Sequence, residues 1–514
     1  MNGLRAGSLA AVVLLSSACA VGPDFKKPQA AVAEKWGAAN DARVASQRTA
    51  DAQWWKSFND PALDHLIELA YRQNLPLQVA GLRIVEARAR LGVVSGRIYP
   101  QTQEAFGNAS VIGLSDNVSK IGNIPRSYVG YQVGFDAAWE MDFWGKYRRG
   151  IEAETSALIA SIANYYAAIV SLTAEVARTY VLIRTTEVQL QQARDNVTLQ
   201  EQALAIATAR FRNGETSELD PTQASTLLDT TRALIPQREI DLQQARNALS
   251  TLLGQPAGTI DTVLARGSKT IPTAPVKVAV GMPADILRRR PDVRGAEMNA
   301  AVQCARIGVS KADLYPSFSL VGTVGLDAST RGTASSNLFR TGSIFYSVGP
   351  QVNWAFLNYG RIENAVRVED ARFQQLLVEY RNTVLNAAQE VEDALVGFLD
   401  AQQAATFRQS AVTSAQRAVQ LAFVAYREGA VDYQRVLDAE RSLLENQDTL
   451  AQASSSIATY LVALYKALGG GWEVRQGELV VTEETRHEME QRTNWGGMLS
   501  KPRPSETQNP QPAK

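Results

Sequence analysis

The sequence predicts a mainly α-helical chain with a β-barrel portion, built by tandem duplication of one unit. Three observations support this prediction: landmarks that recur at a nearly constant offset, an apolar residue at every seventh position in two long segments, and two segments that alternate apolar with polar side chains. The chain has 514 residues and a formal net charge of zero, so it lacks the basic footprint of a nucleic-acid-binding protein.

The duplication is visible in three pairs of similar segments. RIYPQTQ is echoed by DLYPSFS, AWEMDFWGKYR by NWAFLNYGRIE, and ARFRNGETSELD by AYREGAVDYQRV. Their matching residues lie 216, 215 and 215 positions apart: Tyr99 and Tyr315, Trp139 and Trp354, Gly214 and Gly429. Because separated landmarks rarely keep one offset by chance, we expect a duplication of roughly 215 residues.

Each copy is expected to contain one very long helix. An apolar or aromatic residue recurs every seven positions from Ile162 to Phe211, and the same register runs from Leu377 to Tyr426. Segments 151–213 and 361–429 contain no proline. A sustained seven-residue period predicts helices packed side by side, each roughly 90–100 Å long at 1.5 Å per residue. A free coiled-coil rod is the simpler alternative.

The ends of these helices are marked by glycine. Gly214 and Gly429 are expected to stop the two long helices, since glycine adopts the left-handed conformation that ends a helix. Asp220 and Asp432 can then start the return helices, and Pro221 suits a first helical turn.

Before each long helix, apolar and polar residues alternate with the period of a β-strand. The apolar set includes Val133, Phe135 and Trp139 in the first copy, and Tyr346 and Val348 in the second. Weaker strands precede them near 101–112 and 317–326, so each copy offers a hairpin. A soluble sandwich could use such hairpins. If they enter a membrane, several subunits must share one barrel because open strand edges are not tolerated in lipid, and a trimer would supply twelve strands.

The N-terminus reads as a secretory signal that ends at a cysteine. A positive Arg5 precedes an apolar run over 9–15, and small residues lead to Cys19 in LLSSACAVGPDF. This stretch resembles the lipobox of bacterial lipoproteins, in which the cysteine is acylated; Ala20 after it favours the outer membrane. An incidental cysteine in a soluble exported protein is the alternative. If Cys19 is acylated, Cys304 has no intrachain partner.

Longer segments resemble the TolC-like outer-membrane factor family of Gram-negative bacteria, and more narrowly its NodT-like lipoprotein branch, which serves RND-type efflux systems. They are CAVGPDFKKP (19–28), WWKSFNDPALDHLIELAYRQN (54–74) and MPADILRRRPDVRGAEMNAAVQCARIGVSKADLYPSFSL (282–320). The resemblance implies a homotrimer in which a twelve-stranded outer-membrane β-barrel continues into a long periplasmic α-helical barrel. A mixed equatorial belt would surround it, formed near 36–70, by 255–285 and after Lys466.

The expected organisation has five parts. They are a signal peptide (1–18), an N-terminal anchor and extended segment (19–60), repeat 1 (61–270), repeat 2 (271–475) and a C-terminal segment with a disordered end (476–514). Each repeat is expected to hold a helix, a β-hairpin (about 101–142 or 317–356), a long helix (about 150–213 or 361–428) and a return helix.

The resemblance also implies a gate at the periplasmic tip. Asp438 matches the position of a ring carboxylate, with Arg441 as a candidate ion-pair partner, and Asp220 holds the corresponding place in the first copy. Arg435 stands where some members have a further Asp, a departure that alters the bonding expected there. The alternative is that Asp438 is an ordinary exposed helix residue. The turns expected to contact an adaptor contain Phe211, Gly214, Tyr426 and Gly429.

The polar strand face is expected to line the lumen, with Asp136, Glu140 and Gln351 on it, while Trp139 and Trp354 suit the lipid interface. A solvated face without a role in selectivity is the alternative for Asp136 and Glu140.

Nothing in the sequence suggests an enzyme. The two histidines, His65 and His487, are far apart, and we expect no metal site, no cofactor and no nucleic-acid partner. The function expected is a passive outer-membrane channel of a tripartite efflux system, lipid-anchored through Cys19. Its partners would be a periplasmic adaptor and an inner-membrane RND-type pump. Antibiotics, solvents, phenolics or metal ions would all pass a wide polar duct. A periplasmic lipoprotein tether without a channel is the alternative.

Overall fold

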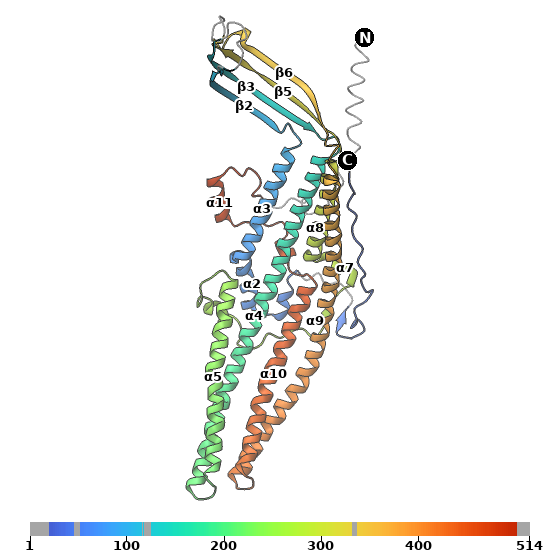
Figure 1. Ribbon diagram of the computed structural model, residues 1–514. Helices are drawn as coiled ribbons and strands as arrows, with labels where there is room; N and C mark the ends of the chain where they lie inside the picture. The colour runs from blue at the N-terminus through green and yellow to red at the C-terminus, as the bar shows by residue number, and fades with distance from the viewer. Residues whose placement is uncertain (1–19, 46–51, 116, 118–124, 332–336, 501–514) are drawn as a thin grey trace.

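A β-sheet at one end and helical tips at the other define the long axis of the protomer, which is a computed structural model (Figure 1). The structure describes residues 20–45, 52–115, 117, 125–331 and 337–500. Each half of the chain contributes the same order of main elements: two helices, two strands, a long helix and a return helix.

In the first half these elements are α2 (Pro61–Gln73), α3 (Leu75–Gly96), β2 (Thr102–Gly113), β3 (Ser127–Met141), α4 (Lys146–Arg212) and α5 (Leu219–Leu252). In the second half they are α7 (Pro283–Arg289), α8 (Pro291–Ala312), β5 (Ser317–Ser329), β6 (Ile344–Asn353), α9 (Arg361–Arg427) and α10 (Tyr433–Ala467). The shorter elements are β1 (Val44–Ala45), η1 (Trp54–Phe58), α6 (Asp261–Leu264), β4 (Val278–Ala279), η2 (Thr341–Ser343), η3 (Glu473–Arg475) and α11 (Glu483–Arg492).

Local contacts repeat along with the order of elements. The Trp139 indole donates a hydrogen bond to the Ile98 carbonyl at 3.1 Å, and the Trp354 indole donates to the Leu314 carbonyl at the same distance. Both long helices also start after a glycine with positive φ, Gly145 and Gly360. The duplication read from the sequence therefore extends to hydrogen bonds and backbone conformation.

The sequence predicts one helix ahead of each hairpin, and the structure has two. In the first half, the Asn74 side chain accepts a hydrogen bond from the Leu77 amide and caps α3, in which Pro76 occupies the first turn. In the second half, Arg290 is extended because it precedes Pro291, which separates α7 from α8.

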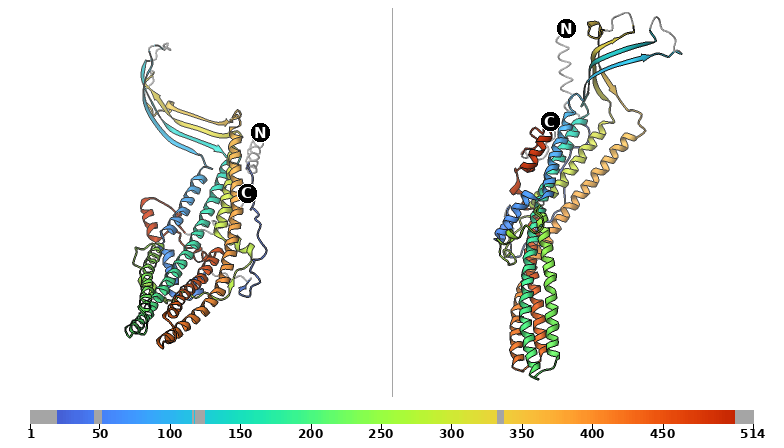
Figure 2. Two further views of the ribbon diagram at one scale, coloured as in Figure 1. Left: turned by 60° about the horizontal axis from the view of Figure 1, so that its bottom comes forward. Right: turned by 90° about the vertical axis from the view of Figure 1, so that its left-hand side faces the viewer.

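The four long strands form one curved antiparallel sheet in the order β2-β3-β5-β6 (Figure 2). Its register aligns Phe135 with Val324 and Val324 with Tyr346, all of which are exposed. On the other face, Thr323 donates a 2.6 Å hydrogen bond to Asp136 from the neighbouring strand. One face is thus apolar and exposed and the other polar, while β2 and β6 are left as edge strands of the protomer.

The middle of the molecule is a belt in which remote segments meet. β1 pairs in parallel with β4, and the Trp36 indole donates to the Gly281 carbonyl at 3.1 Å. The largest buried cluster lies here, and it includes Trp54, Leu66 and Ile169. These contacts join 36–70 and 255–285, the segments expected to form an equatorial belt.

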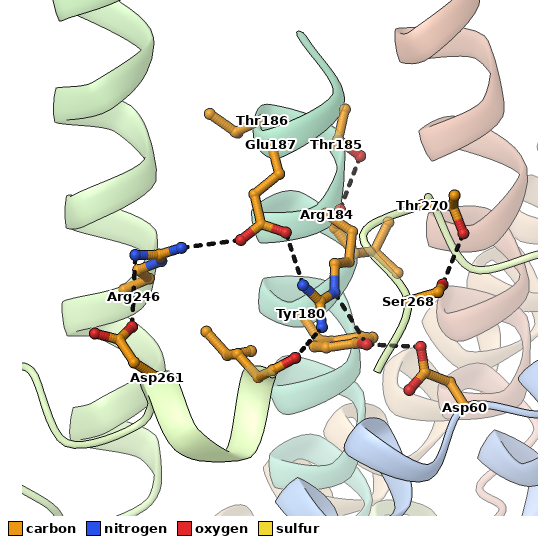
Figure 3. Close-up of polar contacts among 12 residues, drawn as sticks. Asp60, Tyr180, Arg184, Thr185, Thr186, Glu187, Arg246, Asp261, Ser268 and Thr270 are labelled. Carbon is orange, nitrogen blue, oxygen red and sulfur yellow. Dashed lines mark hydrogen bonds and ion pairs between the residues drawn. The ribbon is translucent and has the colours of Figure 1, made fainter. Parts of the chain in front are cut away.

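Buried charges fix α4 within this belt (Figure 3). Arg184 is 1% exposed and donates to the Tyr180 hydroxyl at 3.1 Å and to Glu187 at 2.7 Å. Tyr180 donates in turn to Asp60 at 2.6 Å, and Arg246 of α5 donates to Glu187 at 2.9 Å. Because a buried charge is stable only when paired, this chain of contacts holds α2, α4 and α5 in one arrangement.

The first and last described segments cover equivalent helices. The N-terminal strap (residues 20–32) lies on α8, where the Cys304 thiol faces the Pro23 carbonyl at 3.5 Å and Lys27 pairs with Glu297 at 2.9 Å. The last described residues (480–500) lie on α3, where Arg88 donates to the Met498 carbonyl at 2.7 Å. Arg88 and Cys304 are 216 residues apart, so the covered positions correspond.

Candidate functional site

The tip of the protomer is formed by the free ends of α4, α5, α9 and α10 and by two tight turns (Figure 1). Gly214 and Gly429 follow the two long helices with φ of 77° and 76°. Residues with a Cβ rarely adopt this left-handed backbone conformation. Glycine adopts it without strain, so the chain can turn here from each long helix to its return helix. The α4–α5 hairpin and the α9–α10 hairpin therefore end in equivalent turns.

Tyr426 connects the two hairpins. Its hydroxyl donates to the Asp220 carboxylate of α5 at 2.9 Å, and its carbonyl accepts a hydrogen bond from Arg210 of α4. The Arg210 guanidinium also lies 4.7 Å from the centre of the Tyr426 ring. Burial, followed by the Asp220 contact, raises the pKa of Tyr426 to about 12, so the tyrosine stays neutral and remains a donor.

The matching residue of the first turn behaves differently. Phe211 is 40% exposed, whereas Tyr426 is 1% exposed and packs edge-on against Tyr433 at 5.3 Å between ring centres. The two turns are thus equivalent in backbone but not in side-chain contacts. Phe211 is the one that presents an aromatic surface to the outside of the protomer.

Asp438 lies outside this network. It is exposed and accepts a hydrogen bond from the Gln434 side chain at 2.9 Å. Arg441 is also exposed, and within the described part of α10 no ion pair joins it to Asp438. The candidate pair is therefore not formed in the protomer, where the carboxylate is bonded by Gln434, one turn earlier on α10. Of the two expected gate carboxylates, Asp220 is bonded across hairpins and Asp438 faces solvent.

The sequence interpretation missed three buried polar residues near the tip: Gln200 on α4, and Tyr433 and Glu440 on α10. Each is 1% exposed, and the polar side-chain atoms of all three have no hydrogen-bond partner among the described residues. Glu440 could have been found, because it interrupts an apolar stripe formed by Tyr433, Val436, Leu437 and Leu443.

Burial has a marked effect on Glu440. Loss of hydration raises the pKa of its carboxyl to about 7, and the Tyr433 hydroxyl, which lies close without completing a hydrogen bond, counteracts this by less. Glu440 is thus poised to change charge near neutral pH.

The expected lumen residues share the polar face of the sheet. Asp136 is bonded to Thr323, and Gln351 on β6 is exposed and aligned with Ser319, itself aligned with Glu140. Glu140 lies at the foot of the sheet, where its backbone amide donates to Gln101 at 2.7 Å.

Cys19, the expected lipidation site, lies outside the described residues. Among the residues that are described, no group of three or more His, Cys, Asp and Glu side chains is arranged to hold a metal ion.

This combination defines a class of protein. A curved sheet with an exposed apolar face and two open edges must be completed by other copies before it can sit in lipid, and helical hairpins extend from it to a tip at which Tyr426 joins α9 to α5. Such a chain is one protomer of an outer-membrane channel with a periplasmic helical tube.

The comparisons identify the family. A family model described as outer membrane efflux protein matches residues 66–255 and again 282–470, so the chain belongs to that family and its duplication is confirmed. It is 32% identical to the probable outer membrane lipoprotein SilC of Salmonella typhimurium, over 92% of this chain and all of that protein. It is 30% identical to the cation efflux system protein CusC of Escherichia coli, over 90% of this chain and 98% of that protein.

A solved structure of the outer-membrane channel OprN superposes with a TM-score of 0.82 at 31% identity, covering 88% of this chain and all of the other. The trimeric barrel fold, the efflux-channel function and the outer-membrane location predicted from the sequence are therefore confirmed.

Proposed function

We propose that this chain forms a passive duct for small molecules whose periplasmic end is gated at the tip described above. The proposal rests chiefly on Tyr426, which joins the two hairpins through Asp220 and Arg210. Separating the hairpins breaks a hydrogen bond to a carboxylate and a cation–π contact, so the closed arrangement is favoured until something offsets that loss.

The partners follow from the shape of the tip. A periplasmic adaptor would contact the turns that contain Phe211, Gly214, Tyr426 and Gly429, and the exposed Phe211 ring offers it an apolar contact. The duct itself performs no catalysis, and an inner-membrane RND-type pump would supply the energy for transport.

Lipid would anchor the chain at the foot of the barrel. The N-terminal strap starts there: the Val21 amide donates to the Trp144 carbonyl at 3.0 Å, and Ala20 lies against Gly145 at the start of α4. Cys19 directly precedes Ala20 in the sequence, so acylation of Cys19 would attach lipid next to the start of the N-terminal strap.

The gate can be opened by mutation. Asp438→Ala combined with Arg441→Ala removes both charged groups from the solvent-facing side of α10, where three-fold symmetry would bring the copies together. We expect a higher single-channel conductance in planar bilayers. Glu445→Ala, an exposed change on the same helix, serves as the matched control. Unchanged conductance in the double variant would contradict the gate assignment, and absence of any ion current in the unmodified protein would favour a tether.

A further inference from the structure

Glu440 and Gln200 lie at one level of the joint between the two hairpins, and Tyr433, two turns away on α10, brings its hydroxyl near Glu440. α4 and α10 run in opposite directions: Asn196 donates to Gln447 at 2.6 Å, and Ala203 packs in one cluster with Tyr433 and Val436. Gln200 lies between Asn196 and Ala203 on α4, and Glu440 lies between Val436 and Gln447 on α10. Their side chains are therefore buried at the same height of the helix pair.

These buried side chains have polar atoms without hydrogen-bond partners, and the residues around them are apolar. Both Glu440 carboxyl oxygens, both polar atoms of the Gln200 amide and the Tyr433 hydroxyl lack a partner within the described ranges. The surrounding residues are small or aliphatic, among them Ala203, Leu437 and Leu443. An ionised carboxylate without a cation or several donors is strongly disfavoured in such surroundings, whereas a protonated one is a neutral donor.

Among the described residues, no cation from the packed helices forms an ion pair with this carboxyl. At this end of the joint, Arg210 on α4, Asp220 on α5, Tyr426 on α9 and Tyr433 on α10 are partly or fully buried. The charged groups Arg435, Asp438 and Arg441 on α10, Glu201 on α4 and Arg417 on α9 are exposed. Arg210 is already engaged by the Tyr426 carbonyl and by Glu215, and Asp220 accepts from Tyr426. The Tyr433 hydroxyl is the side-chain group that acts on Glu440, and burial raises the pKa of Tyr433, so the tyrosine stays neutral.

We propose that Glu440, together with Gln200 and Tyr433, forms a buried proton-binding site at the joint between the hairpins, filled in the closed tip and emptied as the hairpins separate. The ligand is the proton itself. A carboxylic acid can donate to the Gln200 amide oxygen, whereas the carboxylate requires water and so favours parting of α4 from α10. The inference rests on the tip being the gate, and it adds that periplasmic pH sets how firmly the gate closes.

The sign of the pH effect follows from this arrangement. The pKa of Glu440 is raised to about 7 in the folded tip from an ordinary value of 4.5, so the closed tip binds a proton that the separated tip releases. Closure is therefore strongest at acidic pH and weakens as pH rises towards and through about 7.

Single-channel recording of the purified full-length protein tests the proposal. Between about pH 5.5 and about pH 8.5 we expect the open fraction of the unmodified channel to rise several-fold. Glu440→Gln, which keeps the shape but cannot ionise, should remove the rise and stay closed. Glu445→Gln, exposed on the same helix, should retain it. A rise of equal size in Glu440→Gln would overturn the proposal.

Infrared absorption of the unmodified protein provides a reading that does not depend on the variant's folding. The band of a protonated buried carboxylic acid should be present at acidic pH and disappear as pH passes about 7; its absence at every pH would also overturn the proposal. The gate itself is judged separately. If Asp438→Ala with Arg441→Ala conducts more while Glu440→Gln keeps the pH response, the gate stands and the proton site fails.

Discussion

The long helices α4 and α9 have the same length, 67 residues each, and the same heptad register, yet they are packed differently. In the protomer α4 has 31 buried residues and α9 has 14. Tyr180 and Arg184 of α4 enter the charged network of the belt, whereas the corresponding Leu395 and Leu399 of α9 pack into the apolar core. The two copies therefore share one helix length and register, and their different side chains make different contacts.

The exposed side of α9 carries large apolar residues that the protomer itself does not cover. Val378, Leu385, Val396, Phe407 and Leu421 are each about half exposed or more, while α4 leaves few large apolar residues uncovered. An apolar stripe of this extent on a soluble helix indicates a protein contact. In a three-fold assembly we expect the stripe to lie against the adjacent protomer, whereas α4 is buried mainly within its own chain.

Substitution within that stripe gives the largest expected effect. Phe407, 67% exposed in the protomer, would be covered in the trimer, so Phe407→Asp would bury an unpaired charge in each contact, at a cost of roughly 3–5 kcal/mol. We expect loss of the heat-sensitive trimer band on gels and of the trimer mass in detergent. Phe407→Leu is the matched control and should preserve the trimer. An intact trimer in Phe407→Asp would mean that α9 is not the contact helix.

The covered helices α3 and α8 allow a second, smaller test. An added Cβ at Gly308 of α8 would come within 2.8 Å of the Val21 carbonyl in the N-terminal strap, whereas at the matching Gly92 of α3 it would meet only the flexible end of Met498 at 3.3 Å. Gly308→Ala should therefore destabilise the protein by about 1–3 kcal/mol, and Gly92→Ala should be nearly neutral.

Thermal unfolding of the two alanine variants measures this difference. Equal melting temperatures of Gly308→Ala and Gly92→Ala would contradict the prediction. They would show that the N-terminal strap shifts to accept the added methyl group as easily as the Met498 side chain does.

The two turns give the smallest expected effect. Tyr426→Phe removes the hydrogen bond to Asp220 but keeps the ring, so it should weaken the joint between hairpins by about 1–2 kcal/mol and raise the open fraction modestly. Phe211→Leu, at the matching exposed position, should leave the open fraction unchanged. Planar-bilayer recordings of both variants would be compared, and equal behaviour would mean that Tyr426 does not hold the tip closed.

Sequence alone predicts the parts of this molecule that local rules determine. The seven-residue period indicated both long helices, Gly214 and Gly429 marked their ends, and two-residue alternation marked the strands. These features depend on residues that are close together in the chain. Sequence periodicity and the backbone preference of glycine are therefore enough to predict them.

Contacts between remote segments could not be obtained in that way. Spacing on α10 suggested that Asp438 pairs with Arg441, but both side chains are exposed in the protomer and Asp438 is bonded by Gln434. The difference between Tyr426 and Phe211 depends on Asp220 and Arg210, which come from the other hairpin. Glu440 was visible only as a polar interruption, and its burial depends on α4 packing against α10.

The most direct test is the three-dimensional structure of the purified assembly by electron cryomicroscopy. We expect three copies around one continuous water-filled axis, with β2 of each copy joined to β6 of the next and Phe407 covered by the adjacent protomer. A monomer, or an assembly in which those strand edges and the α9 stripe remain uncovered, would contradict the claim that two unlike halves of each chain build one shared tube.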